Sequence, residues 1–175
     1  QCLLSSMIGG RSGNRGRCAQ PCRLSYSLVV LSEDRVIKDL PAPGDHLLST
    51  RDLKAIEFIP QLIGAGSTSF KFEGRMKRPE YVATVIRIYK QALDRYYQDP
   101  KNYKVLPHEL QQLEQVFNRD FTTAYLTQEP GEGLISYTKP SNRGVFLGRV
   151  LEVKDSWAKV RLEQELQLGD GIEVW

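Results

Sequence analysis

The feature that most constrains the fold is a long amphipathic segment in the middle of the chain, at residues 79–98. Its apolar residues recur three and four positions apart, so they share one face of a helix. This stripe consists of Val82, Val85, Ile86, Tyr89, Leu93 and Tyr96. Pro79 suits the first turn of a helix, and Asp99-Pro100 provides a stop. We therefore expect one helix over residues 79–98, packed by this face onto a core.

A short apolar segment and a charged loop precede this helix. Residues 67–72 have the composition of a buried strand, and residues 73–78 are mostly charged. The order of strand, loop and helix makes a βα unit, and α/β barrels carry their active sites at the carboxyl ends of such strands. The sequence therefore predicts an α/β fold, with Glu73 and Arg75 as candidate catalytic residues. A salt bridge between these two side chains is the alternative for the pair.

The remaining elements are predicted from shorter patterns. Residues 127–142 are rich in Gly, Pro and Ser, which is typical of a linker. A lone histidine such as His46 is more often structural than catalytic. We expect a hairpin from residues 25–31 and 35–37, and a helix that Ser49 caps together with Asp52 three residues on and that Pro60 bends or ends. We also expect a helix over residues 107–118 and strands at 144–150, 157–162 and 171–175.

The length of 175 residues allows one domain, or part of one domain with a small module. We divide the chain into an α/β part at residues 1–99, a connecting helix and linker at 100–142, and a small β-module at 143–175. Residues 165–171 resemble the turn before a strand in small barrels of the translation-factor type. The third part is therefore expected to be β-barrel-like and to stop at Trp175 before such a barrel closes.

The charge is informative in its distribution rather than in its total of +3. Four arginines, Arg11, Arg15, Arg17 and Arg23, precede the first carboxylate of the chain, Glu33. Arginine pairs with carboxylate or phosphate, so these residues, together with Lys71 and Lys77, are candidate substrate-binding residues for an anionic partner. A solvated basic loop is the alternative. No apolar run is long enough for a membrane span, and no signal peptide is visible, so we expect a cytoplasmic protein.

All three cysteines lie near the start of the chain, at Cys2, Cys18 and Cys22, in the spacing C-x15-C-x3-C. Thiolates bind zinc and iron–sulfur clusters, which makes these residues candidate metal ligands. A metal site usually needs four protein ligands. Either a fourth ligand comes from elsewhere, or these are ordinary thiols.

Two blocks of this sequence resemble the signature regions of peptidase family U32, the collagenase-like peptidases. The first consists of CLLS at residues 2–5 and SGNRGRCAQPCR at 12–23, and the second of KFEGRMK at 71–77 with PEYV at 79–82. The resemblance is strong over residues 1–98, and residues 118–126 resemble a later segment of the family. It implies that residues 1–99 are the final part of a TIM-like (β/α) barrel.

The resemblance also implies a choice of functions. Some members of the family are described as degrading collagen, and others act in hydroxylation of tRNA bases, rRNA bases or a quinone precursor. Some of these hold a four-iron four-sulfur cluster (4Fe-4S) on four cysteines, of which one lies upstream of the position matching Cys2. The fourth cysteine is then missing from this chain, and zinc is the less favoured metal.

We favour iron–sulfur-dependent hydroxylation of an RNA base, with RNA or an acidic small-molecule co-substrate as partner. The alternative is a collagenase-like peptidase acting on a peptide. The sequence has no Gly-x-Ser-x-Gly elbow and no His-Glu-x-x-His helix, and a cysteine nucleophile would need a histidine such as His46 nearby. We expect this stretch of chain to be inactive without the rest of the barrel.

Overall fold

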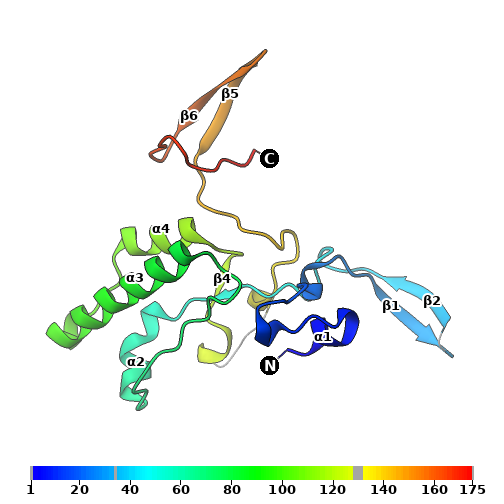
Figure 1. Ribbon diagram of the computed structural model, residues 1–175, viewed down its shortest axis with the longest axis horizontal. Coiled ribbons are helices and arrows are strands. Elements are labelled where there is room, and N and C mark those ends of the chain that lie inside the picture. The colour runs from blue at the N-terminus through cyan, green and yellow to red at the C-terminus, as the bar shows by residue number, and fades with distance from the viewer. Residues whose placement is uncertain (1, 34, 128–131, 175) are drawn as a thin grey trace. The chain divides into compact units, whose positions relative to one another are not determined.

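The computed structural model describes residues 2–33, 35–127 and 132–174, and the chain divides into two units, Gln1–Arg143 and Gly144–Trp175. The first unit contains the helices α1 (Leu4–Gly9), α2 (Ile59–Gly64), α3 (Pro79–Gln98) and α4 (Pro107–Val116), and the strands β1 (Leu28–Ser32), β2 (Arg35–Leu40), β3 (Asp52–Leu53) and β4 (Phe121–Thr122). The second contains β5 (Gly148–Lys154) and β6 (Trp157–Leu162). Figure 1 shows these elements along the chain.

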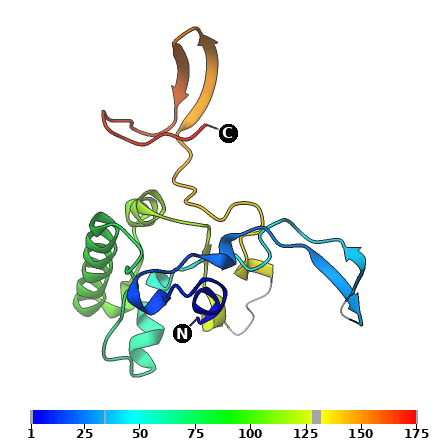
Figure 2. The same ribbon diagram turned by 45° about the vertical axis from the view of Figure 1, so that its right-hand side comes forward.

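Helix α3 has the predicted bounds and organises the core of the first unit. Its predicted stripe faces inward at Val85 and Tyr89, which are buried together with Ile88 and Ala92. Ile56, Ile59 and Leu113 complete the cluster of buried apolar residues. Helix α4 lies beside α3 in both views (Figure 1, Figure 2) and confirms the prediction for residues 107–118, although it ends at Val116.

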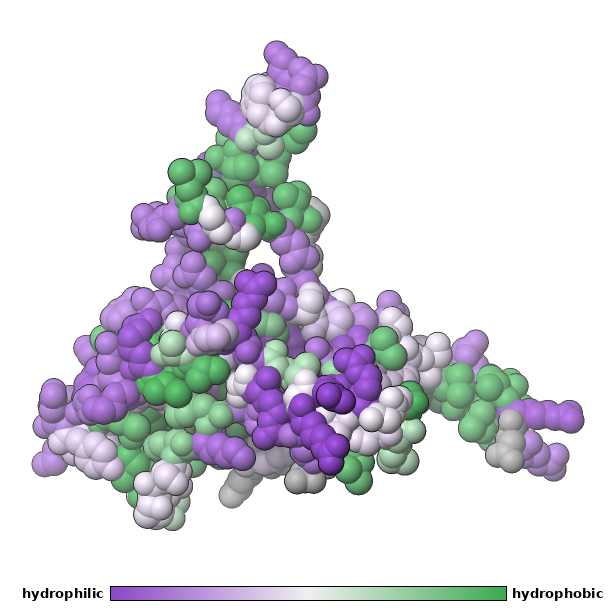
Figure 3. Space-filling model, in the orientation of Figure 1, coloured by the Kyte–Doolittle hydropathy of each residue, from purple (hydrophilic) through white to green (hydrophobic). Residues whose placement is uncertain are grey.

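The predicted hairpin at residues 25–31 and 35–37 and the predicted strand at 157–162 are confirmed, whereas the strand predicted at 144–150 begins only at Gly148. β1 and β2 pair antiparallel, and β5 and β6 do the same in the second unit. Apolar side chains such as Ile37 and Val153 are exposed on them, and Figure 3 shows such apolar surface on both hairpins. Residues 171–174 form no strand, so the described part of the strand predicted at 171–175 is wrong, and Trp175 lies outside the described residues.

The helix predicted to start at Ser49 is wrong in its first half. The segment is extended, with Thr50 bridged to Ile135 and β3 paired in parallel with β4. Asp52 binds Arg119 instead of completing a helix cap, and the helical turns begin only at Ile56. Distant partners therefore override the local capping pattern. Pro60 lies in the first turn of α2, where a proline is tolerated.

The strand predicted at residues 67–72 is also wrong as a paired element. Among the described residues none forms a ladder with this segment, and a strand requires hydrogen bonds from a neighbour. Phe72 nevertheless packs edge-on against Tyr89, with ring centroids 4.8 Å apart. Within the described ranges the sole parallel pair is β3 with β4 and no barrel closes, so the TIM-like barrel and the small β-barrel stay predictions.

The described part of the predicted linker at 127–142 packs onto the first unit. Ser136 is buried, and its N–H donates to the carbonyl oxygen of Ser49 at 2.7 Å. Lys139 is buried as well. Residues 128–131 lie outside the described residues, so the linker prediction is not tested there. None of the helices described is both long and apolar enough to cross a membrane.

Candidate functional site

Asp52 is the carboxylate around which the charged side chains of the first unit gather. Arg119, which follows α4, donates to it three times: its backbone N–H and its Nε reach Oδ2 at 2.9 and 3.1 Å, and its Nη2 binds Oδ1. Both side chains are largely buried, at 13% exposure for Arg119 and 19% for Asp52. The pair therefore joins β3 to the segment leading into β4 and fixes the orientation of both groups.

Arg23 lies within reach of the charge of the same carboxylate. It belongs to the segment at residues 10–23 that carries Cys18 and Cys22, which we call the cysteine loop. Its Nη1 donates to Ser49 Oγ and to the carbonyl oxygen of Thr50, both at 2.8 Å. Burial and the positive charge of Arg119 lower the pKa of Arg23, whereas the nearby Cys22, Asp52 and Cys18 act in the opposite direction. Arg23 is therefore a half-buried cation that shares its surroundings with two thiols and with Arg119.

Lys77 approaches from the loop before α3. Its ammonium group lies over the rings of Phe117 and Tyr81, so part of its hydration is replaced by aromatic faces. Burial lowers the pKa of Lys77 to about 8, with the positive charge of Arg119 and then of Arg23 adding to the effect and Asp52 opposing it. We call Arg23, Lys77, Arg119 and Asp52 the basic cluster. Three cations there face one carboxylate, and a bound anion would relieve this imbalance.

The low pKa of Lys77 predicts a rise in stability between about pH 8 and about pH 10. In this window the unfolded chain still holds the lysine proton, while the folded protein has lost it. The unfolded state then binds more protons, so the free energy of unfolding increases with pH. Replacing Lys77 with methionine should remove this part of the rise, which denaturant unfolding at several pH values would measure. Equal pH slopes for the two proteins would contradict the proposed burial of Lys77.

The cysteine loop is a built structure rather than a loose tail. Ser5 in α1 is buried, and its Oγ accepts a hydrogen bond from Ala19 N–H at 2.8 Å. Cys18 Sγ accepts from Gln20 N–H at 3.3 Å, and Gln20 adopts a left-handed backbone with φ 54°. Cys18 and Cys22 are therefore held on either side of a fixed turn, beside Arg23.

The three cysteines are not gathered into a metal site. All three are free thiols, Cys2 is exposed, and the described residues include no group of three Cys, His, Asp or Glu side chains placed to hold a metal ion. The residues present do not by themselves fit a four-iron cluster or a zinc site, since three or four converging ligands are needed. The iron–sulfur cluster stays a prediction, and no step below depends on it.

Arg75 joins the two blocks of sequence that carry the family resemblance. Its guanidinium group donates to the carbonyl oxygen of Asn14, and its backbone N–H donates to Glu73 Oε1 at 2.9 Å. A Cβ at Gly16 would lie 3.6 Å from Arg75 Cγ. The glycine-rich loop, which we define as residues 9–16, therefore runs close along this side chain. In the described part of the chain no ion pair joins Glu73 to Arg75, and the alternative of a mutual salt bridge is wrong.

The other predicted anion-binding residues are not among the charges that act on Arg23 or Lys77. Arg11 Nε donates to the carbonyl oxygen of Arg17 at 2.9 Å, which braces the glycine-rich loop. Arg15, Arg17 and Lys71 are exposed. His46 Nδ1 lies 3.3 Å from the carbonyl oxygen of Leu24, so its contact is with the backbone. Of the predicted binding residues, Arg23 and Lys77 are the two that the structure brings together.

Asp52 and Arg119 are site residues that sequence reasoning missed. Asp52 was assigned to a helix cap, and Arg119 stood in a segment noted only for its resemblance. The two residues are 67 positions apart, so no local pattern signals their pairing. Arg119 lies between Asn118 and Asp120. The sequence indicates a charged turn after a helix at this point, but it does not indicate which residue Arg119 pairs with.

Comparison with known proteins finds relatives that are named for different activities. A family model described as Peptidase family U32 matches residues 1–136. The chain is 35% identical over 184 residues to tRNA hydroxylation protein P1 of Bacillus subtilis, covering 100% of this chain and 43% of that protein. It is 35% identical over 179 residues to a collagenase of Porphyromonas gingivalis, covering 99% of this chain and 42% of the relative.

A third relative is an Escherichia coli protein named as a 23S rRNA 5-hydroxycytidine synthase. It is 31% identical over 180 residues, which cover 99% of this chain and 27% of that protein. The chain thus spans less than half the length of the curated relatives it matches. No solved structure matches it significantly.

Proposed function

The chain belongs to peptidase family U32, and we propose that it is part of an enzyme that hydroxylates a base of RNA. Relatives named for tRNA hydroxylation and for rRNA hydroxycytidine synthesis support this proposal. The observation that carries it is the basic cluster, in which Arg119 pairs with Asp52, and Arg23 and Lys77 lie close enough to this pair to feel its charges, with Cys18 and Cys22 near Arg23. Such a half-buried excess of positive charge suits a phosphate of RNA or a carboxylate of an acidic co-substrate.

Each member of the cluster has a distinct part in this proposal. Arg23 and Lys77 bind the anion, because in the described part of the chain neither is paired with a carboxylate of its own as Arg119 is. Arg119 and Asp52 fix each other's orientation through two parallel hydrogen bonds of the kind that arginine makes to a carboxylate. Arg75 keeps the glycine-rich loop against the Glu73 loop, so that both sides of the site move together.

The fold and location of the full-length protein are part of the same proposal. We propose that residues 1–99 complete a TIM-like barrel with residues outside this chain. The second unit would then belong to a small β-barrel. The thiols of Cys2, Cys18 and Cys22 do not converge in this chain, and they would be ligands of an iron–sulfur cluster if residues outside this chain brought them together. A cellular RNA substrate would place the enzyme in the cytoplasm.

Peptide hydrolysis is the second candidate function, since two relatives from Porphyromonas gingivalis are named collagenase. Cys18 and Cys22 lie near Arg23, and a cysteine thiol would be the nucleophile of such an enzyme. The general base that a cysteine nucleophile needs is missing, because among the described residues no hydrogen bond joins a histidine to Cys18 or Cys22, and His46 contacts the carbonyl oxygen of Leu24. This geometry makes hydrolysis the weaker candidate.

Nucleoside mass spectrometry of tRNA and rRNA tests the proposal. RNA from a strain lacking the full-length gene should lack one hydroxylated nucleoside, and a plasmid copy should restore it. An unchanged nucleoside profile, together with cleavage of denatured collagen that Cys18→Ala abolishes, would favour the peptidase instead. Collagen cleavage that survives Cys18→Ala would remove this thiol from the peptidase mechanism.

A further inference from the structure

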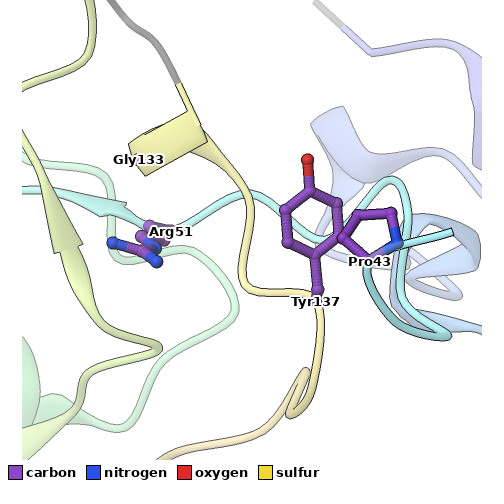
Figure 4. A pocket seen from close by; sticks show the side chains of 4 residues that line it. All are labelled: Pro43, Arg51, Gly133 and Tyr137. Carbon is purple, nitrogen blue, oxygen red and sulfur yellow. The ribbon is translucent and has the colours of Figure 1, made fainter.

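A second polar site lies in the first unit. A cavity of about 350 Å³ is lined by Pro43, Arg51, Gly133 and Tyr137. Figure 4 shows Tyr137 and Pro43 on one side of it and the guanidinium group of Arg51 on the other. Its volume is at the lower end of the range for small-molecule pockets.

The walls of this cavity are fixed by backbone contacts. His46 N–H donates to the carbonyl oxygen of Tyr137 at 3.0 Å, and a Cβ at Gly44 would lie 2.8 Å from the same oxygen. Only glycine therefore lets the Pro43 segment approach Tyr137 so closely. On the opposite wall, Arg51 N–H donates to the carbonyl oxygen of Leu134 at 2.9 Å. Both walls are thus held before any ligand arrives.

Arg51 and Tyr137 bring suitable chemistry to the cavity. Arg51 is partly buried, and its Nε donates to the carbonyl oxygen of Ile135 at 3.2 Å, which orients the guanidinium plane. Among the described residues its two terminal nitrogens have no hydrogen-bond partner, so they can bind an anion with two parallel bonds. The ring of Tyr137 offers a flat apolar face, and Pro43 extends this apolar wall.

The cavity and the basic cluster share one segment of chain. Arg23 of the basic cluster contacts Thr50, and the next residue, Arg51, lines the cavity. Asp52, the residue after that, holds Arg119. The guanidinium group of Arg23 therefore contacts the residue directly before Arg51, and both groups can bind phosphate.

We propose that this cavity binds one nucleotide of the RNA substrate, with its base stacked on Tyr137 and its phosphate paired with Arg51. The inference rests on the proposed function, because that function makes RNA the substrate. Stacking of a base on an aromatic ring and pairing of phosphate with arginine are the two contacts that single-stranded nucleic acid makes with proteins. The adjacent Arg23 would bind the next phosphate along the strand.

Three small probes test this site without any hydroxylation. Uridine 5′-monophosphate should bind the full-length protein about tenfold more tightly than uridine, which lacks the phosphate, or ribose 5-phosphate, which lacks the base. Titration calorimetry would measure the three affinities. Equal affinities for all three, or no binding of the nucleotide, would overturn the proposal.

Two sets of variants assign the contacts. Tyr137→Leu should weaken nucleotide binding about tenfold and Tyr137→Phe should leave it unchanged, because the ring and not the hydroxyl makes the contact. Arg51→Gln should weaken binding of the nucleotide and not of uridine. The controls are Tyr125→Leu and Arg87→Gln, which change exposed residues outside the cavity and should have no effect.

The outcomes separate this inference from the proposed function. If Tyr137→Leu abolishes nucleotide binding, but the deletion strain lacks no hydroxylated nucleoside, the nucleotide site stands and the hydroxylation is refuted. A dependent nucleoside that is unaffected by Tyr137→Leu and Arg51→Gln would keep the hydroxylation and refute the nucleotide site.

Discussion

Replacing Asp52 with asparagine should lower the free energy of unfolding by about 3 kcal/mol, since it removes the charged partner of a largely buried arginine. The carboxylate of Asp52 accepts three hydrogen bonds from Arg119, and both side chains are less than one-fifth exposed. Without this charge, Arg119, Arg23 and Lys77 repel one another with no carboxylate between them. Urea unfolding of wild type and Asp52→Asn would measure the difference.

Asp94→Asn is the matched control for this substitution. Asp94 pairs with Lys90 one helical turn away in α3, with the two side chains 49% and 66% exposed, respectively. An exposed pair of this kind contributes at most about 0.5 kcal/mol. Similar losses for Asp52→Asn and Asp94→Asn would show that the basic cluster is as solvated as the surface, and the proposed site would lose its physical basis.

The double substitution Arg23→Gln with Lys77→Gln should lower the level of the hydroxylated nucleoside about a hundredfold, at roughly tenfold for each lost charge-assisted contact. Both side chains are partly buried, both face Asp52, and neither forms a salt bridge of its own among the described residues. Their charge is therefore available to a ligand. Nucleoside mass spectrometry of a deletion strain carrying the variant gene would give the remaining fraction.

The comparison variant carries Arg15→Gln and Lys71→Gln. These two residues came from the same sequence prediction, but they are exposed and are not among the charges that act on Arg23 or Lys77. We expect the nucleoside level to fall less than about threefold, as for surface charges that only assist encounter with RNA. Equal losses in the two double variants would mean that total basic charge, and not the cluster, serves the reaction.

The elements that sequence predicted well are those formed by neighbouring residues. The stripe from Val82 to Tyr96 specified α3 because one helix face carries it, and the alternation in residues 157–162 specified β6. The segments at 49–58 and 67–72 failed for the opposite reason. Their conformation depends on Arg119, Ile135 and β4, or on strand partners that no described residue supplies.

The site was predicted in the same uneven way. Residue type alone indicates Arg23, Lys77 and the cysteines as site residues, because basic side chains bind anions and thiols bind metals. It could not separate Arg23 from Arg15 or Lys77 from Lys71, since burial near Asp52 makes the difference. Asp52 itself was hidden because a carboxylate after Ser49 also fits a helix cap.

The central claim is that the basic cluster binds an anion of the substrate, and the affinity of the full-length protein for a short single-stranded RNA tests it most directly. We expect Asp52→Asn to bind more tightly than wild type, because it removes the one negative charge, and Arg23→Gln with Lys77→Gln to bind more weakly. Fluorescence anisotropy at fixed salt would measure all three. The same affinity for all three proteins would contradict the account.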